Sequence, residues 1–435
     1  MKETMRLAVF TNQFPIQGNT FVYRDVRTLL EAGFDIDVFS FYPLDLTLWH
    51  FVPDILREEV FPRNKIHHIN FVQSLLSLRP WPLRKATDFL ADTAAIAGSA
   101  ICSGLSPFVK SMYVLPKAWV WAREYRNHYD HVLAYSGNYS ATCAYMFHRL
   151  IDRPIPFSMF LHAGMDLYDN QAFLRQKLLY ADNIIVVCDF NRQFIQKRYP
   201  DIYDHISKKI HVYHLGLDFS EFPYETDGRQ PRKVLAVGRL DKTKGFDYLF
   251  RAASDLSQRG FNYELELIGD GEEEGALKAL ANQLQIQERV KFTGWLHFDE
   301  VRTAMKQATL LVHPSNGLGD AVPTVIKESM ALGTPVVASN IVGIPELLDN
   351  GRCGMLVPPG NSRLLADAIQ TLLTSNELRR SYADKARRYA EETFDLWRNG
   401  QWLADRLIST KRGTTQRGDS VFSLAAGDGN EAGSS

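Results

Sequence analysis

The sequence predicts an α/β protein built from two doubly wound domains, each a parallel sheet with helices on both faces. Its 435 residues are too many for one ordinary hydrophobic core, so two domains are expected. In the second half, short apolar or alternating segments alternate with helical patterns and glycine-containing turns. The first half repeats this rhythm more loosely. Such alternation of strand and helix is typical of a parallel sheet.

The second half contains the clearer elements. We expect strands at residues 233–238, 263–269, 289–294, 309–313 and 335–339, and helices at 245–259, 273–284, 298–307 and 323–332. Parallel strands point the same way, so the residues that follow them lie on one edge of the sheet, where ligands bind. The residues that follow strands here are Arg239, Asp270, Trp295, Asn316 and Asp320.

The first half is predicted to contain strands at residues 5–11, 34–40, 65–70, 131–135, 156–161 and 183–187, and a helix at 20–32. Proline, glycine and aspartate cluster in the polar stretch 221–233, which predicts a linker. The predicted domains are therefore residues 1–225 and 226–394. We expect the amphipathic helix at 395–410 to pack on the first domain. Residues 411–435, rich in glycine, serine and threonine, predict a disordered tail.

Composition excludes several classes of function. A net charge of −1 offers no general attraction for nucleic acid, so any anion site must be local. The four cysteines are far apart, which argues against a zinc site or a disulfide framework and suits a reducing cytosol. We expect neither a signal peptide nor a membrane span. The weakly charged stretch 93–109 is interpreted as a buried helix with a loop.

Two motifs predict the ligand. In residues 313–338, the carboxylates of Asp320 and Glu328 flank a loop-to-helix junction, and a helix start offers free N–H groups to a phosphate or a hydroxyl. Upstream, a strand-to-helix turn at 237–245 carries the cations Arg239 and Lys244. One anionic ligand rich in hydroxyl groups would explain both motifs. A sugar nucleotide has both properties.

With these motifs laid out, the chain resembles the retaining glycosyltransferase family 4, whose GT-B fold has two Rossmann-like domains facing across a cleft. The second domain carries Gly-Arg-Leu with Lys-Gly at 238–245, Leu-Ile-Gly-Asp-Gly at 267–271, Phe-Thr-Gly at 292–294, His-Pro-Ser at 313–315 and the carboxylate pair. The first domain resembles the bacterial exopolysaccharide and colanic-acid branch through Leu161-His-Ala and Asp166-Leu-Tyr. The resemblance covers roughly residues 5–410. One departure is Asp320-Ala321, where the family usually has Glu-Gly.

The resemblance implies roles for particular residues. Arg239 and Lys244 would hold the diphosphate, Glu328 the ribose hydroxyls and Asp320 a hydroxyl of the donor sugar. His162, near Asp166, would face the donor sugar at the reaction centre. The remaining predicted donor contacts are Gly18 and Asn19 near the diphosphate or the acceptor, Gly269, Asp270, Gly294 and Trp295 beside the base, and the backbone of Val322, Pro323, Thr324 and Val325.

Each role has a plainer alternative. The cations could form a solvated basic turn, Glu328 could be an exposed helix residue, and Asp320 could simply cap a helix. His162 could be a structural histidine, and the glycines could belong to ordinary turns. We interpret His313 and Pro314 as structural.

A metal requirement is not expected. Asp35-Ile-Asp37 has the spelling of an Asp-x-Asp metal motif, but it lies inside a strand pattern where both aspartates share a solvated face. We therefore predict metal-independent transfer without a cofactor, in which Arg239 and Lys244 neutralise the leaving group. Retention by same-face attack is implied by the resemblance alone.

The predicted function is transfer of a hexose from a UDP- or GDP-sugar to a lipid-linked or polysaccharide precursor in the cytoplasm. A disaccharide synthase with a small acceptor and a weakly active sugar-nucleotide-binding protein are the alternatives. In residues 75–90, Arg79, Arg84 and Lys85 mix with Trp81 and Phe89. This segment could rest peripherally on the inner face of the membrane, or it could be an ordinary helical excursion.

Overall fold

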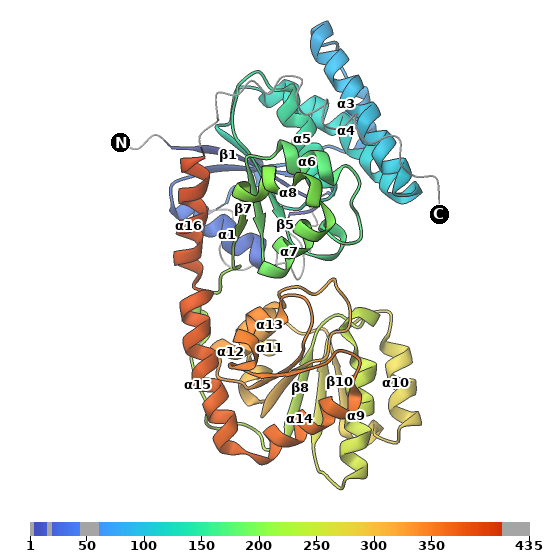
Figure 1. Cartoon of the computed structure of the whole chain (residues 1–435), viewed down its shortest axis with the longest axis vertical. Helices are drawn as coiled ribbons and strands as arrows, with labels where there is room; N and C mark the ends of the chain where they lie inside the picture. The colour runs from blue at the N-terminus through green and yellow to red at the C-terminus, as the bar shows by residue number, and fades with distance from the viewer. Residues whose placement is uncertain (1–3, 15–19, 44–60, 411–435) are drawn as a thin grey trace. The chain divides into compact units, whose positions relative to one another are not determined.

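The computed structural model describes residues 4–14, 20–43 and 61–410 and divides into two compact units. Unit 1 comprises residues up to Val187, residues 191–213 and the chain from Gly400 onward. Unit 2 comprises residues 188–190 and 214–399. Gly18, Asn19 and the predicted tail lie outside the described residues. The units are drawn in Figure 1, and each is described by itself.

Within the described residues, unit 1 is built on a seven-stranded parallel sheet with the order β3-β2-β1-β4-β5-β6-β7. The strands are β1 (Arg6–Thr11), β2 (Asp35–Ser40), β3 (Ile66–His67), β4 (His131–Ala134), β5 (Phe157–Leu161), β6 (Asn183–Val186) and β7 (Ile210–Val212). The helices are α1 (Thr20–Glu31), α2 (Phe71–Leu76), α3 (Leu83–Cys102), α4 (Leu105–Tyr125), α5 (Tyr139–Leu150), α6 (Leu174–Tyr180), α7 (Asp189–Arg198) and α8 (Pro200–Ile206).

The core of unit 1 is rich in aromatic residues and lies between the sheet and helices α4 to α6. Phe10 of β1 stacks on Phe39 of β2 with ring centroids 4.7 Å apart, and Trp121 of α4 meets both rings edge-on. From Gly400 onward, α16 (Leu396–Ser409) belongs to this unit, where Trp402 stacks on Tyr213. These contacts fix the sheet whose edge carries His162.

The part of unit 2 that the structure describes has a six-stranded parallel sheet with the order β10-β9-β8-β11-β12-β13. The strands are β8 (Lys233–Val237), β9 (Glu264–Ile268), β10 (Val290–Gly294), β11 (Leu310–His313), β12 (Val336–Ser339) and β13 (Met355–Val357). The helices are α9 (Phe246–Gln258), α10 (Glu274–Gln283), α11 (Phe298–Gln307), α12 (Thr324–Ala331), α13 (Ile344–Leu347), α14 (Ser362–Thr374), α15 (Asn376–Thr393) and the start of α16. The predicted two doubly wound α/β units are confirmed.

The strand predictions need three corrections. The strand predicted at 65–70 shrinks to Ile66–His67, because Asn70 caps α2: its side chain accepts a hydrogen bond from Gln73 N at 2.8 Å. The sequence prediction omitted β7 and β13. Each has only three residues, too few to show a period of two.

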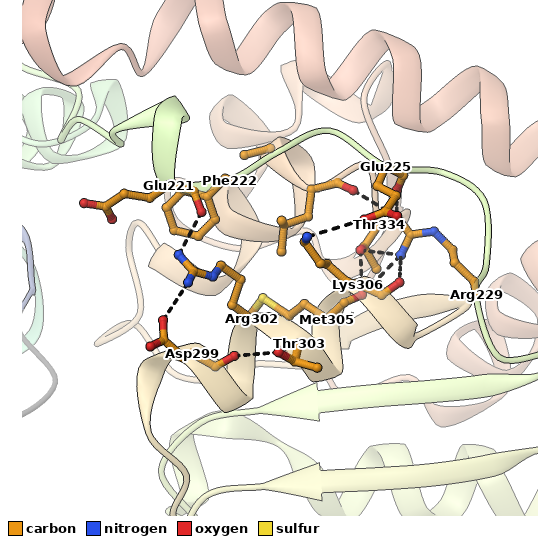
Figure 2. Close-up of polar contacts among 12 residues, drawn as sticks. Glu221, Phe222, Glu225, Arg229, Asp299, Arg302, Thr303, Met305, Lys306 and Thr334 are labelled. Carbon is orange, nitrogen blue, oxygen red and sulfur yellow. Dashed lines mark hydrogen bonds and ion pairs between the residues drawn. The ribbon is translucent and has the colours of Figure 1, made fainter.

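The polar stretch 221–233, predicted as the linker, lies within unit 2, and the division falls between Tyr213 and His214. Arg229 holds this stretch to the rest of unit 2. One guanidinium nitrogen donates to the carbonyls of Met305, Lys306 and Ala308 and to Thr334 Oγ1, and the other donates to Leu332 and Glu225 (Figure 2). On the same surface, Arg302 donates to the carbonyl of Glu221 at 2.8 Å. Proline and glycine here shape a surface turn that side chains hold to unit 2.

Arg229→Met is expected to lower the stability of unit 2 by ~3 kcal/mol, because several carbonyls would lose their donor. Burial lowers the pKa of Arg229 to about 10, so the side chain is still charged at neutral pH. Calorimetric unfolding of the variant and wild type measures the change. The control is Arg352→Met, which removes an exposed guanidinium from the same unit. Equal melting temperatures for all three proteins would contradict this prediction.

Candidate functional site

The predicted ligand-binding residues of unit 2 lie at one edge of its sheet. The strand order reverses between the adjacent strands β8 and β11, and ligands of such sheets bind beyond the carboxyl ends at this point. Arg239 follows β8, Asp270 follows β9 and Trp295 follows β10, while Asn316 and Asp320 follow β11. The prediction that these five residues share an edge is confirmed.

Asp320 is the centre of a polar cluster at this reversal point. Lys244 Nζ donates to Asp320 Oδ2 at 2.7 Å, and Ser315 Oγ donates to the same oxygen at 3.0 Å. His313 Nε2 lies 2.6 Å from it. Burial alone would raise the pKa of the Asp320 carboxyl, but its interactions with His313 and Lys244 outweigh burial and hold the pKa well below its usual range. Asp320 is therefore ionised at neutral pH.

Contacts between two loops bring this cluster together. Ser315 Oγ donates to the carbonyl of Thr243 at 2.8 Å, and Asn316 N donates to the same carbonyl at 2.9 Å. Gly245 has φ +64°, and a Cβ there would lie 2.3 Å from the carbonyl oxygen of Pro314. Only glycine fits at that close approach, which seats Lys244 beside the loop after β11.

Arg239 is placed differently from Lys244, although the sequence predicted that the two cations act together. Its side chain is 77% exposed, and Nη2 lies 3.1 Å from Asp241 Oδ2. Arg239 thus extends into solvent at the edge where Lys244 is held in the cluster. An exposed guanidinium on a mobile stem can reach a ligand without breaking a buried contact.

The turns predicted beside the base follow β9 and β10. Gly269 has φ +139°, and a Cβ there would lie 1.9 Å from the carbonyl oxygen of Gly238, so this position excludes every other residue. Leu240 N donates to the carbonyl of Asp270 at 2.7 Å. Gly294 also has a positive φ, of +74°, and the next residue, Trp295, is exposed.

Helix α12 begins directly after the Asp320 loop. Its N-cap residue is Pro323, so the alternative that Asp320 caps the helix is wrong. The first helical residues are Thr324 and Val325, whose N–H groups point out of the helix start. Glu328 is only 5% exposed, so the alternative of an exposed helix glutamate is wrong as well.

In unit 1, His162 follows β5 and is oriented by an acid. Its Nδ1 lies 3.1 Å from Asp166 Oδ2, and Asp166 also accepts a hydrogen bond from Ser136 Oγ. The ring packs against Phe21 and Phe160. Its Nε2 is buried and has no hydrogen-bond partner among the described residues. Buried polar nitrogens are normally bonded, so a ligand atom would satisfy this one.

The sequence prediction missed an aromatic hollow at the strand-order reversal of unit 1, between β1 and β4. Lys117 supports its wall, donating to the carbonyl of Phe41 at 2.7 Å and to the Tyr113 hydroxyl at 3.1 Å. The scattered aromatic residues gave no motif: Phe41 and Tyr42 follow β2, Tyr113 lies within α4 and Tyr139 begins α5. The hollow is lined by Asn12, Phe41, Tyr42, Lys110, Tyr113, Val114, Asn138 and Tyr139.

The Asp-x-Asp spelling lies in β2, as predicted, but its carboxylates face side chains rather than solvent alone. Lys65 Nζ donates to Asp35 Oδ1 at 2.7 Å, and His67 Nε2 lies 2.7 Å from Asp37 Oδ1. Among the residues described, no three acidic, histidine or cysteine side chains are grouped so that they could hold a metal ion. Asp35 and Asp37 thus join β2 to the start of β3.

Comparison with known proteins defines the class. Residues 222–389 match the family model "Glycosyl transferases group 1", and this domain match lies within unit 2. The two Rossmann-like parallel sheets, together with this domain match, show that the chain has the GT-B fold. The predicted resemblance is confirmed at this level.

Particular relatives match along most of their length. The chain is 26% identical over 411 residues to the amylovoran biosynthesis glycosyltransferase AmsK of Erwinia amylovora, covering 86% of this chain and 91% of that protein. It is 23% identical to the putative colanic acid biosynthesis glycosyltransferase WcaL of Escherichia coli, covering 90% and 96%. Among solved structures, Anabaena Alr3699/HepE in complex with UDP-glucose aligns with a TM-score of 0.68 and 19% identity, covering 93% of this chain and all of that one.

Proposed function

We propose that the protein is a retaining glycosyltransferase that moves a hexose from a UDP- or GDP-sugar to a lipid-linked or polysaccharide precursor at the inner face of the cytoplasmic membrane. The Lys244–Asp320–His313 cluster at the strand-order reversal of unit 2 carries this proposal. The names of AmsK and WcaL, and the UDP-glucose bound to HepE, support the exopolysaccharide and nucleotide-sugar parts.

Donor binding needs positive charge where the diphosphate leaves. Negative charge grows on the leaving phosphate as the bond to the anomeric carbon breaks, so cations and N–H groups held there lower the barrier. In the proposal, Lys244 and Arg239 supply this charge, the start of α12 supplies N–H donors, and Glu328 accepts from the ribose. No metal ion is required. All three contacts of Asp320 use Oδ2, which leaves Oδ1 to accept from a hydroxyl of the donor sugar.

Acceptor binding is assigned to unit 1. The aromatic hollow offers the rings of Tyr42, Tyr113 and Tyr139 together with polar groups, and aromatic faces suit the C–H-rich face of a sugar. His162 Nε2 would contact the reacting sugar. In the proposed step, the acceptor oxygen bonds to the anomeric carbon on the face that the diphosphate leaves. The acceptor's proton passes to the departing phosphate oxygen, which balances the reaction.

The experiment is transfer from radiolabelled UDP- and GDP-hexoses to an acceptor-rich membrane extract, with and without EDTA. We expect one donor to be used, equal rates under both conditions and an α-linked product from an α-linked donor. Loss of activity in EDTA with recovery in manganese would contradict metal independence, and a β-linked product would contradict retention. Nucleotide binding without any transfer would instead favour a sugar-nucleotide-binding protein.

A further inference from the structure

In helix α3 of unit 1, the charged residues Lys85 and Asp92 contact the rest of the unit, whereas Arg84 is exposed. Asp92 is buried and lies 2.8 Å from Arg149 Nε, and it also accepts from the Tyr145 hydroxyl. Lys85 Nζ donates to the carbonyl of Ile151 at 3.1 Å. These polar contacts fix the face of α3 that meets α5 and the loop after it, and hence the face that looks outward.

The outward face of α3 is apolar. Leu83 is 80% exposed, Leu90 65% and Ile101 61%. Thr87, Ala94 and Gly98 lie between them and are exposed as well. Steps of three or four residues place all six on one side of a helix, within about 80°. Figure 1 shows α3 and the neighbouring α4 at the periphery of unit 1.

The helices before and after α3 also carry exposed apolar residues. Val72 and Leu76 of α2 and Leu105 and Val109 of α4 are exposed, with Leu76 at 82%. Nine of the 17 exposed large hydrophobic residues in the described part of the chain lie between positions 72 and 109. The stretch 93–109, predicted to be buried, is therefore largely exposed at its end. So large an apolar area marks a contact surface rather than chance exposure.

The aromatic residues predicted to touch a membrane do not belong to this surface. Trp81 and Phe89 pack on Trp119 of α4, with ring centroids 5.3 and 4.8 Å away. The exposed apolar residues of this segment are Leu83 and Leu90 instead, because the helix turns them outward.

Charge at this surface has one sign. Arg79, Arg84 and Lys110 are exposed. The acids between residues 71 and 110 are Asp88 and Asp92, and neither is exposed. A second copy of the chain docked face to face would bring arginine against arginine, which disfavours a symmetric dimer. Anionic phospholipid offers both hydrocarbon and the opposite charge.

We propose that α2, the outer face of α3 and the start of α4 form a membrane-contact face that rests on an anionic lipid surface. No helix in the described ranges has the length and low polarity needed to cross a bilayer. In this proposal the helices lie on the membrane surface. This inference does not depend on the proposed function and would hold for a protein of any activity.

Helix α4 links the membrane-contact face to the aromatic hollow that is proposed to bind the acceptor. Leu105 and Val109 lie on that face, and the same helix contributes Lys110 and Tyr113 to the aromatic hollow. An acceptor sugar carried on a lipid would meet the hollow next to the bilayer surface. This consequence, unlike the contact itself, rests on the proposed function.

The test is flotation of the full chain with phosphatidylcholine vesicles that contain or lack phosphatidylglycerol. We expect wild type to float with the anionic vesicles, and the triple variant Leu83→Gln/Leu90→Gln/Ile101→Gln to bind at least about tenfold more weakly. Arg79→Gln/Arg84→Gln should weaken binding to anionic vesicles only, and more so at low salt. The matched control, Leu364→Gln/Ile408→Gln, removes exposed apolar residues elsewhere and should float like wild type.

Failure takes recognisable forms. Wild type that stays unbound, or a triple variant that floats equally well, overturns the membrane-contact face. If light scattering instead shows a dimer that the triple variant loses, a second copy is the occupant. Circular dichroism checks that the triple variant is folded. Transfer to a soluble acceptor is measured separately, so a protein that floats but does not transfer refutes only the proposed function.

Discussion

Replacing Lys244 with methionine is expected to lower kcat for sugar transfer about 100- to 1,000-fold, the usual effect of removing one fixed donor from a developing anion. The ammonium is held at the strand-order reversal of unit 2, where the proposed diphosphate binds. Methionine keeps much of the volume and loses the charge. Initial rates with the preferred nucleotide sugar measure the effect, and UDP or GDP titration measures binding.

Lys242→Met is the matched control for this variant. Lys242 lies two residues away and is 83% exposed, and its nearest acid, Glu273, is 4.0 Å distant. We expect the control to retain nearly full activity. A Lys244→Met enzyme with wild-type kcat and wild-type nucleotide affinity would remove Lys244 from the proposed diphosphate site. Asp320 would then hold it only for stability.

His162→Ala is expected to lower transfer at least about 100-fold while leaving affinity for the free nucleotide nearly unchanged. The reason is that, in the proposal, unit 2 binds the nucleotide and His162 of unit 1 contacts only the reacting sugar. Its Nδ1 is engaged by Asp166, and its Nε2 is the nitrogen left for that sugar. Asp166→Asn should show a smaller loss of the same kind, because the amide still orients the ring.

His205→Ala serves as the control, since His205 is an exposed histidine of unit 1. Transfer rates and calorimetric nucleotide binding are measured for all four proteins. Parallel loss of transfer and nucleotide affinity in His162→Ala would contradict a role confined to the sugar. If His162→Ala also lowers the melting temperature enough to explain the loss of transfer and of nucleotide affinity, the role of His162 is structural.

The longer strands of the fold could be predicted because each has a clear local pattern of apolar residues. Strands such as β8 and β9 are five-residue apolar or alternating runs ended by glycine, and their order along the chain implies the parallel sheet. The three-residue strands β7 and β13 carry no such pattern. The unit division lies upstream of the predicted linker, and long-range contacts tie residues 214–225 to unit 2: Lys327 Nζ donates to the carbonyl of Leu215, and Arg387 Nη1 donates to that of Phe222. Composition does not reveal such contacts.

The shared sheet edge was predictable from the sequence, whereas the pairing of the side chains on it was not. Strand ends placed Arg239 and Lys244 on one edge, but their different exposure follows from Asp320, which is 76 residues beyond Lys244. His313 was interpreted as structural, yet it contacts the same carboxylate. The aromatic hollow joins residues from three strand ends and α4, and no local spacing indicates that they meet.

The Lys244–Asp320 pair has a consequence for how the donor arrives and how the spent nucleotide departs. In the proposed site, Asp320 would act as a resident counter-ion, so an incoming diphosphate would displace one anion from the ammonium rather than meet a bare charge. Part of the Coulomb attraction is thereby cancelled in advance, which keeps nucleotide affinity moderate. When the nucleoside diphosphate leaves the proposed site, the carboxylate would bind the lysine again, which would favour dissociation. Asp320→Asn should therefore hold the product longer, which pre-steady-state release measurements would detect.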